Sequence, residues 1–372
     1  SSGTPRFDYD PVTHAPKGIL IEETRTNKVL MSERFDDPSW IKVRTSVSSD
    51  VILAPDGNLT ADKQVEDTTA LNNHLLTKIV GNPMSSSGKY TFTVYAKKAE
   101  RNNLILRLVD DAAVADRRYL VNFNLNSGSI TSTSSLNSPT NTSNAIQSVG
   151  NGWYRCSATI ELLTANRLDV SLYIFTNDTI PANPTYTGDG VSGLYIWGAQ
   201  VELGSFQTSY IPTTTAAVTR AADALTMPTG GWVNQNNGGF FAQVSTLYSS
   251  ASDNATIRDV MRLSDGTSNN YHRMFQYRAK YGGASASGGT LQADLQTGSI
   301  LVDTIYKIAY SYRPNYFIAA VGGILTANDM SGTVPTVTTL SLGGYSPLNG
   351  HIEKFHYYPS SPSDTQLQLL TQ

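Results

Sequence analysis

The sequence predicts an all-β protein of two antiparallel β-sandwich (jelly-roll) domains, with very little helix apart from a short C-terminal one. One observation is composition: of 372 residues, 40% are hydrophobic and only 15% are charged, and 20 are tyrosines. A charged fraction near a quarter is usual in globular proteins. The other observation is that many short runs alternate apolar and polar residues, with turn signals between them, which is typical of half-buried strands.

The strands of the first domain are expected from residue 88 onward. Segments 88–98, 102–110, 119–130, 149–162 and 167–178 each alternate with a period of two. Turns are predicted at Asn126-Ser127-Gly128 and Asn151-Gly152. Short strands joined by turns, without a long helix, indicate a jelly-roll sandwich. The side chains expected to face its core are Tyr90, Phe92, Val94, Ala96, Leu104, Leu106, Leu108, Tyr119, Val121, Phe123, Leu125, Tyr154, Cys156, Ala158, Ile160, Leu168, Val170, Leu172 and Ile174.

The stretch "LYIWGAQVELGSFQTSYIPT", residues 194–213, completes this series. Alternation predicts one core-facing set, which makes Trp197 a core residue rather than a ligand contact. Gly204 is expected to let the chain turn, so that Phe206 and Tyr210 fold back and Pro212 ends the strand. The expected core-facing set is Tyr195, Trp197, Ala199, Val201 and Leu203.

The rest of the chain divides around this domain. Residues 1–25 contain three prolines and no period, so we expect an extended N-terminal connecting segment. Residues 26–212 form the first sandwich, 213–225 a linker, and 226–372 a second sandwich. In that second sandwich Asp265-Gly266 marks a hairpin, and Ser363 with Gln366 predicts the start of the C-terminal helix.

Five motifs resemble known families. The sequences "GILIEETRTN", "GNGWYRCSATI", "YIWGAQVELGSFQTSYIPT" and "AVTRAAD" resemble a carbohydrate-binding-module-like domain of bacteriophage tail fibre and spike proteins, over residues 5–225. The sequence "LNGHIEKFHYYPSSPSDTQLQLLT" is similar to concanavalin A-like (laminin-G-type) lectin domains, over residues 226–372. The resemblance implies a virion protein, and such modules usually follow an anchoring segment. Because the chain begins at Ser1 without Met, we expect that segment upstream.

Composition and motifs argue against several other functions. The net charge of −3 does not favour nucleic acid, whose binding needs clustered Lys and Arg. No apolar run is long enough to cross a membrane, and the single Cys156 excludes an intrachain disulfide. Hydrolase and phosphate-binding motifs are missing, and Glu22-Glu23 would point to opposite sides of an extended chain. We therefore expect no enzyme. No cofactor is expected, although oxygen ligands in either sandwich would suit a structural Ca²⁺.

Sugar binding needs an aromatic platform and polar groups that hold hydroxyls. If their strands share one sheet, the outward residues of the first domain would form such a concave face. The alternative to sugar binding for Trp153 is that it covers the edge of the sandwich. For Arg107 and Arg155 the alternative is that they form surface ion pairs. In the second domain the alternative for each candidate is an ordinary turn or surface residue. The candidates are Tyr95, Lys97, Arg107, Asn122, Asn124, Trp153, Arg155 and Tyr173 in the first domain, and Asp265, Asn270, Tyr271 and Arg273 in the second, with Asn269 and Tyr345 beside them.

The sequence therefore predicts an extracellular virion protein, a phage fibre or spike that recognises bacterial surface polysaccharide. Its partners would be that polysaccharide and other virion proteins, joined through the upstream segment. Multivalency would amplify weak sites, so we expect a homo-oligomer, a trimer. Two alternatives remain open: a structural virion module without sugar binding, and a polysaccharide depolymerase.

Overall fold

The computed structural model describes residues 4–111, 116–181, 183–247, 256–343 and 345–372. The chain forms two compact units. The first, here called the inserted sandwich, is Arg25–Arg220, and the second, the C-terminal sandwich, combines Ser1–Thr24 with Ala221–Gln372. The all-β prediction is confirmed, since the described residues contain many antiparallel strands and one helix, α1 (Asp364–Thr371).

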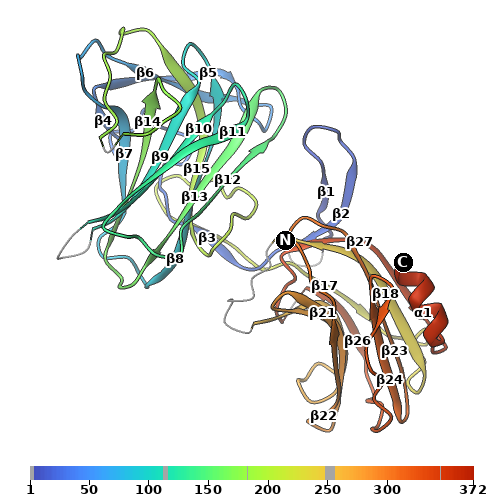
Figure 1. Ribbon diagram of the computed structural model, residues 1–372. Coiled ribbons are helices and arrows are strands. Elements are labelled where there is room, and N and C mark those ends of the chain that lie inside the picture. Colours follow the sequence, from blue (N-terminus) through green and yellow to red (C-terminus); the bar gives the residue numbers. More distant parts are fainter. Residues whose placement is uncertain (1–3, 112–115, 182, 248–255, 344) are drawn as a thin grey trace. The chain divides into compact units, whose positions relative to one another are not determined.

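The inserted sandwich consists of two six-stranded antiparallel sheets and a short two-stranded pair (Figure 1). Sheet I runs in the order β11 (Ser129–Leu136), β10 (Arg117–Asn124), β9 (Asn103–Asp111), β14 (Arg167–Phe175), β7 (His74–Gly81) and β4 (Ile41–Val43). Sheet II runs in the order β12 (Ser143–Ser148), β13 (Trp153–Leu162), β8 (Gly88–Lys98), β15 (Gly193–Leu203), β6 (Leu59–Glu66) and β5 (Thr45–Leu53). The short pair is β3 (Arg25–Asn27) with β16 (Val218–Arg220).

The core of the inserted sandwich lies between sheets I and II. Every side chain predicted from strands β8, β9, β10, β13 and β14 to face the core lies in it or packs against it. Burial of this apolar surface is the main stabilising contribution, roughly 25 cal/mol per Å² removed from water. Period-two alternation therefore identified core side chains of these strands correctly, although Tyr173, which was predicted to face outward, also lies in this core.

Strand β15 departs from the predicted alternation. The register shifts between Trp197 and Gln200, where Gly198 adopts a φ of 63°. Such a bulge moves the residues before it to the opposite face from the one that simple alternation predicts. Ala199 and Val201 lie in the core as predicted. The prediction for Tyr195, Trp197 and Leu203 was wrong, because the first two lie in a separate cluster outside that core and Leu203 is exposed.

The chain after β15 folds back over the outer face of sheet II, as predicted. Gln200 Oε1 accepts a hydrogen bond from the Ile211 backbone, and Glu202 accepts one from Thr208 N at 2.8 Å. The ring of Tyr210 lies 4.7 Å from that of Trp197. Buried polar groups need such partners, so this return segment, residues 204–213, is fixed by the side chains it covers.

Asn27 joins β3 to the return segment. It is fully buried, and its amide nitrogen donates to the carbonyls of Ala199 and Ile211. Its carbonyl oxygen accepts from the backbone nitrogens of Val29 and Val201. All four hydrogen-bonding positions of one amide are thus used to hold the start of the sandwich against its end.

The C-terminal sandwich also has two antiparallel sheets. Sheet III runs in the order β1 (Phe7–Tyr9), β2 (Pro16–Ile21), β27 (Gly350–Tyr358), β18 (Gly238–Thr246), β23 (Tyr306–Arg313), β24 (Tyr316–Val321) and β25 (Ile324–Leu325). Sheet IV runs in the order β17 (Ala224–Pro228), β26 (Thr339–Gly343), β19 (Ile257–Ser264), β20 (Tyr271–Tyr277), β21 (Lys280–Ser287) and β22 (Thr290–Thr297). Helix α1 packs on sheet III through Leu367 (Figure 1), and Ser363 with Gln366 forms the predicted capping box.

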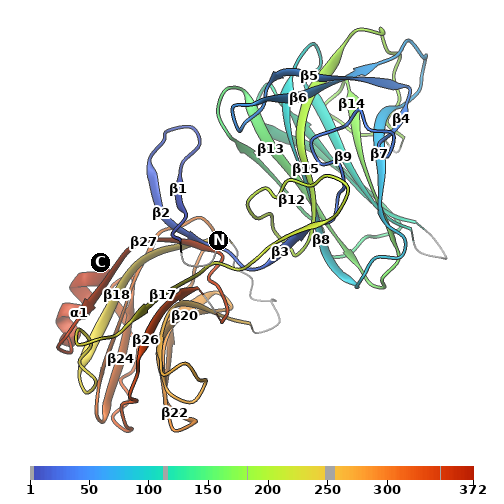
Figure 2. The same cartoon turned by 180° about the vertical axis from the view of Figure 1, so that it is seen from behind.

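The N-terminal segment is extended, but it belongs to the C-terminal sandwich rather than connecting to it. Strand β2 pairs with β27, and the β1–β2 hairpin projects from sheet III (Figure 2). Arg6 donates to both Glu22 and Asp223, two carboxylates that are 1% and 5% exposed. The predicted linker, residues 213–225, likewise contains β16 and the start of β17, so the chain changes unit between Arg220 and Ala221.

We expect Asn27→Ala to lower the free energy of unfolding of the chain by about 3 kcal/mol, because four buried backbone groups lose their partner. Urea unfolding followed by tryptophan fluorescence measures this. The neighbouring Thr26→Ala, which removes only an exposed hydroxyl contact with Thr219, should change it by less than about 0.5 kcal/mol. Equal losses in the two variants would contradict the role given to Asn27.

Arg6→Met should cost about 2–4 kcal/mol at pH 7, because it leaves two buried carboxylates without their cation. Urea unfolding at pH 7 measures this, with Lys17→Met on the same hairpin as the control. An equal loss in Lys17→Met would show that the cost does not come from the two buried carboxylates.

Candidate functional site

The eight sugar-binding candidates of the first domain do not share one face. Strands β8 and β13 belong to sheet II, whereas β9, β10 and β14 belong to sheet I. The expectation of a common concave face was therefore wrong, because the chain crosses from one sheet to the other after β8, β11 and β13. The candidates on sheet II are Tyr95, Lys97, Trp153 and Arg155, and those on sheet I are Arg107, Asn122, Asn124 and Tyr173.

Two of the sheet II candidates are buried within the fold. Trp153 is 2% exposed, lies in one cluster with Trp197, and donates through Nε1 to the Leu53 carbonyl at 3.2 Å. Arg155 is buried, lies over the ring of Tyr95, and donates to the Thr208 carbonyl of the return segment at 2.7 Å. Trp153 therefore packs against the end of β5, which is the covering role that the sequence left open for it, and Arg155 holds the return segment.

Lys97 is half-buried and lies between two aromatic residues. It pairs across the sheet with Trp153 on one side and Tyr195 on the other. Its side chain makes no hydrogen bond or ion pair with the described residues, and a single lysine gives little specificity.

The asparagines on sheet I are engaged by a loop. Asn122 is fully buried and donates to the carbonyls of Asn177 and Asp178. Asn124 donates to the Asp178 carboxylate at 2.9 Å. Both amides hold the loop that follows β14, which satisfies the donors that a sugar would otherwise use.

Tyr173 and Arg107 lie together on sheet I. The Tyr173 ring is 2% exposed and lies 5.2 Å from the Arg107 guanidinium, which also donates to Ser171 Oγ at 3.0 Å. Burial raises the pKa of the Tyr173 hydroxyl against the lowering effect of Arg107. With its ring covered, Tyr173 offers no stacking surface.

In the C-terminal sandwich, Asp265 and Asn270 build a turn. Asp265 Oδ1 accepts from the backbone and the hydroxyl of Thr267, and Oδ2 accepts from Asn270 Nδ2 at 2.8 Å. Asn270 Oδ1 accepts in turn from Gly288 N. These two candidates therefore stabilise the β19–β20 hairpin, the alternative that the sequence had left open.

Tyr271 and Arg273 belong to a cluster on the outer face of sheet IV. Cross-strand pairing sets Arg262 opposite Arg273, and Asp259 opposite Phe275. The arginine–tyrosine patch, as we call it, consists of Asp259, Arg262, Tyr271, Arg273 and Tyr345.

Both guanidiniums of the patch stack between aromatic rings. Arg262 lies 4.1 Å from the Tyr271 ring centroid and 5.0 Å from that of Tyr345. Arg273 lies 5.1 Å from the Tyr271 ring and 4.6 Å from that of Phe275. Cation–π stacking uses the faces of a guanidinium and leaves its N–H edge free to donate.

Those N–H groups find few partners. The nearest carboxylate, Asp259, is 3.8 Å from Arg262 and 4.0 Å from Arg273, beyond hydrogen-bond distance. Within the described ranges neither arginine donates a hydrogen bond, and the Nε atoms of both and Asp259 Oδ1 are buried without a partner. Burial raises the pKa of Asp259 to about 6, although Arg273 and Arg262 lower it.

Sequence reasoning found Tyr271, Arg273 and Tyr345 but missed Arg262 and Asp259. The signal for Arg262 was present, since a hairpin centred on the turn after Asp265 places it opposite Arg273. Asp259 could not be placed by counting, because the register shifts between it and Met261.

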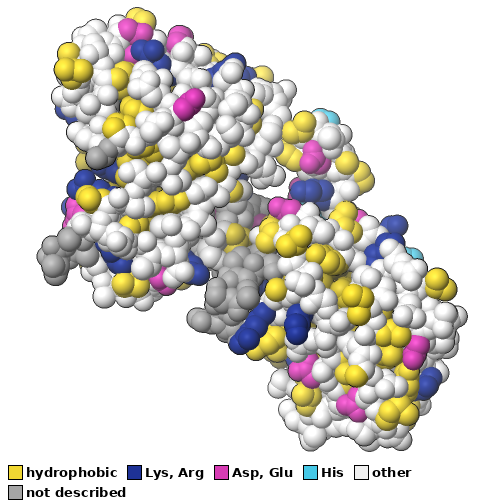
Figure 3. Space-filling model, viewed as in Figure 1, with side chains coloured by type: hydrophobic (Ala, Val, Ile, Leu, Met, Phe, Trp, Pro, Cys, Tyr) yellow, Lys and Arg dark blue, Asp and Glu magenta, His cyan; other side chains and the backbone are white. Residues whose placement is uncertain are grey.

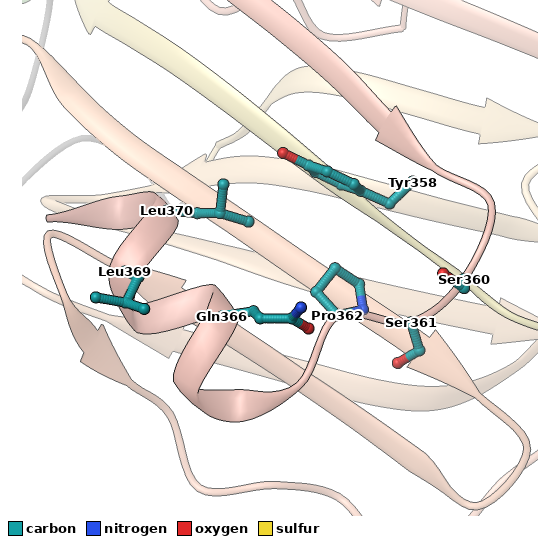
Figure 4. A pocket seen from close by; sticks show the side chains of 7 residues that line it. All are labelled: Tyr358, Ser360, Ser361, Pro362, Gln366, Leu369 and Leu370. Carbon is teal, nitrogen blue, oxygen red and sulfur yellow. The ribbon is translucent and has the colours of Figure 1, made fainter.

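One pocket, of about 370 Å³, lies between α1 and the end of β27 (Figure 4). Gln366 is used in the capping box, and the Ser361 hydroxyl bonds that of Ser311. With the Gln366 side-chain oxygen and the Ser361 hydroxyl engaged, this groove has few polar groups left to orient a sugar. Its lining residues are Tyr358, Ser360, Ser361, Pro362, Gln366, Leu369 and Leu370.

The described residues give limited scope for other chemistry. They contain no group of three or more His, Cys, Asp or Glu side chains placed to hold a metal, so the Ca²⁺ prediction gains no support from such a cluster. No helix among them is long and apolar enough to cross a membrane. His272 is fully buried against Ser285, and burial lowers its pKa to about 3. On the face in Figure 3 charged side chains lie scattered over a mostly uncharged surface.

Comparisons with known proteins gave structural neighbours only. No family model and no curated protein matches the sequence. The CBM40 module of the Ruminococcus gnavus IT-sialidase, bound to α2,3-sialyllactose, is 16% identical, with 37% of this chain and 84% of that one covered and a TM-score of 0.30. Domains LG4–5 of the mouse laminin α1 chain are 10% identical, with 84% and 89% covered and a TM-score of 0.29. Trypanosoma rangeli sialidase is 11% identical, with 83% and 59% covered and a TM-score of 0.30. The function proposed next therefore rests on this chain's own residues.

Proposed function

We propose that this chain is a glycan-binding protein and that the arginine–tyrosine patch is its glycan site. The observation that carries the proposal is the pair of ring-stacked guanidiniums, Arg262 and Arg273, whose N–H groups donate to no described residue and lie beside an exposed tyrosine. Tyr345 is 69% exposed, so its ring can meet a ligand from solvent.

The chemistry of a sugar fits these groups. An aromatic ring covers the apolar face of a pyranose, and a guanidinium edge donates to several hydroxyls at fixed angles. Because Tyr271 holds Arg262 and Arg273 in place, little side-chain freedom is lost on binding. The proposal assigns no catalytic role to the chain.

We also propose that the protein is a receptor-binding fibre or spike protein of a bacteriophage, located in the virion. This part rests on the motif resemblance in residues 5–225 and 348–371. Its ligand would be bacterial surface polysaccharide, and a homotrimer would amplify weak single sites by multivalency. Sizing with light scattering tests the oligomer, and a monomer at micromolar concentration would count against it.

The first test is binding of the labelled chain to an array of bacterial surface polysaccharides. Tyr345→Ala should weaken binding to each recognised glycan about fivefold, corresponding to about 1 kcal/mol for one aromatic contact. Tyr9→Ala is the matched control, since Tyr9 is an exposed tyrosine, 54% accessible, on the β1–β2 hairpin.

A blank array at high protein concentration would contradict glycan binding and favour a structural virion module. Equal losses in Tyr345→Ala and Tyr9→Ala would move the site away from the patch. Release of reducing ends from a bound polysaccharide would instead show a depolymerase.

Trp153→Ala provides a second test, because it separates covering residues from glycan contacts. Removing this buried ring should cost about 3–4 kcal/mol of stability while leaving glycan affinity per folded molecule unchanged. Thermal unfolding and array binding at a temperature where the variant is folded measure the two quantities, with Lys97→Ala as the control on the same face. Lost affinity in a fully folded Trp153→Ala would place the site on sheet II.

A further inference from the structure

The charges of the arginine–tyrosine patch do not balance. Arg262 and Arg273 contribute two positive charges, whereas Asp259 contributes at most one negative charge. The side chains of the two arginines are 7% and 12% exposed, so water screens them weakly. The patch therefore carries an excess positive charge in a partly desolvated position.

The arrangement is also costly in the free protein. Arg262 and Arg273 are direct cross-strand partners, and like charges in such positions destabilise a sheet. Asp259 is 2% exposed, and one of its oxygens accepts no hydrogen bond. A second anion would relieve both problems, because a carboxylate accepts two parallel hydrogen bonds from a guanidinium.

We propose that the patch selects acidic glycans, whose carboxylate binds to the edges of Arg262 and Arg273. Asp259 is the internal anion with which this glycan carboxylate competes. This inference rests on the proposed function and names its ligand class. A neutral sugar would leave the excess charge in place, whereas a uronic acid would neutralise it while its ring contacts Tyr345.

The competition makes binding depend on pH. Among the described residues, the charged groups that act on Asp259 are Arg273 and Arg262. Burial raises the pKa of Asp259 to about 6, so acidification from pH 7.5 to 5.0 neutralises this carboxyl. A glycan carboxylate with an ordinary pKa near about 4 remains ionised over that range. The neutral Asp259 no longer repels the incoming anion, and acidic glycans should bind more tightly at pH 5.0.

The probes are trigalacturonate and its neutral counterpart galactotriose, titrated calorimetrically into the full chain at pH 7.5, 6.5 and 5.0 and constant ionic strength. We expect trigalacturonate to bind about tenfold more tightly than galactotriose at pH 7.5, and its affinity to rise several-fold by pH 5.0. Sodium acetate at an equal carboxylate concentration tests whether the sugar ring contributes.

Variants assign the effect to residues. Asp259→Asn, which is nearly isosteric, should bind trigalacturonate at pH 7.5 as the wild type does at pH 5.0, with a flat pH profile. Arg273→Gln should lose the preference for the acidic sugar. Arg313→Gln is the matched control, because Arg313 also stacks on a tyrosine, Tyr316, at 4.1 Å, away from the patch.

The wild-type pH profile keeps the test decisive if a variant fails to fold. Equal affinity for the two trisaccharides, acetate as effective as trigalacturonate, or no gain in affinity at pH 5.0 would each overturn the inference. If galactotriose binds equally and Tyr345→Ala weakens both sugars, the acidic preference fails while the glycan site stands. If neither sugar binds and the array is also blank, the proposed function fails with it.

Discussion

The structure depends on one constraint: the inserted sandwich must begin and end at the same place. The chain leaves the C-terminal sandwich at Thr24 and returns at Ala221, so the two crossing segments have to lie side by side. Strands β3 and β16 pair on one side of the crossing, and the Glu22 carbonyl accepts from Asp223 N on the other. Insertions with adjacent ends are well tolerated because the host fold is not distorted. The sequences GILIEETRTN (residues 18–27) and AVTRAAD (residues 217–223) form this junction.

Alternation predicted some parts of the fold and not others. Alternation correctly identifies core residues in the regular strands β8 and β14, although the opposite face of β14 is buried too, since Tyr173 is 2% exposed. It fails at Gly198, because a bulge is a one-residue event that glycine permits and no period records. Alternation also fails to predict which strands share a sheet. A period of two shows which face of a strand is apolar but not which strands are neighbours. The N-terminal segment was misjudged because pairing with β27 involves residues more than 300 positions away.

The candidate site shows the same division between local and long-range information. Tyr271 and Arg273 were predicted as rim-loop residues of a lectin-like site, yet their significance comes from Arg262 and Asp259 across the hairpin. Trp153 looked equally suitable in sequence, but in the fold it is 2% exposed and donates to the Leu53 carbonyl of β5. An exposed aromatic and a covered one have the same local pattern, and only tertiary packing separates them.

The patch also differs from the arginines of this chain that bind a carboxylate directly. Arg6 donates to Glu22 at 2.8 Å, and Arg101 donates to Glu66 at 3.0 Å. Each of these two guanidiniums has its charge balanced within the fold, as stability requires of buried ions. Arg262 and Arg273 instead stand opposite each other, with Asp259 beyond hydrogen-bond distance. Since two cores already stabilise the sandwiches, the fold can tolerate this unbalanced pair. The proposed site accounts for an arrangement that weakens the free protein, because an external carboxylate would relieve it.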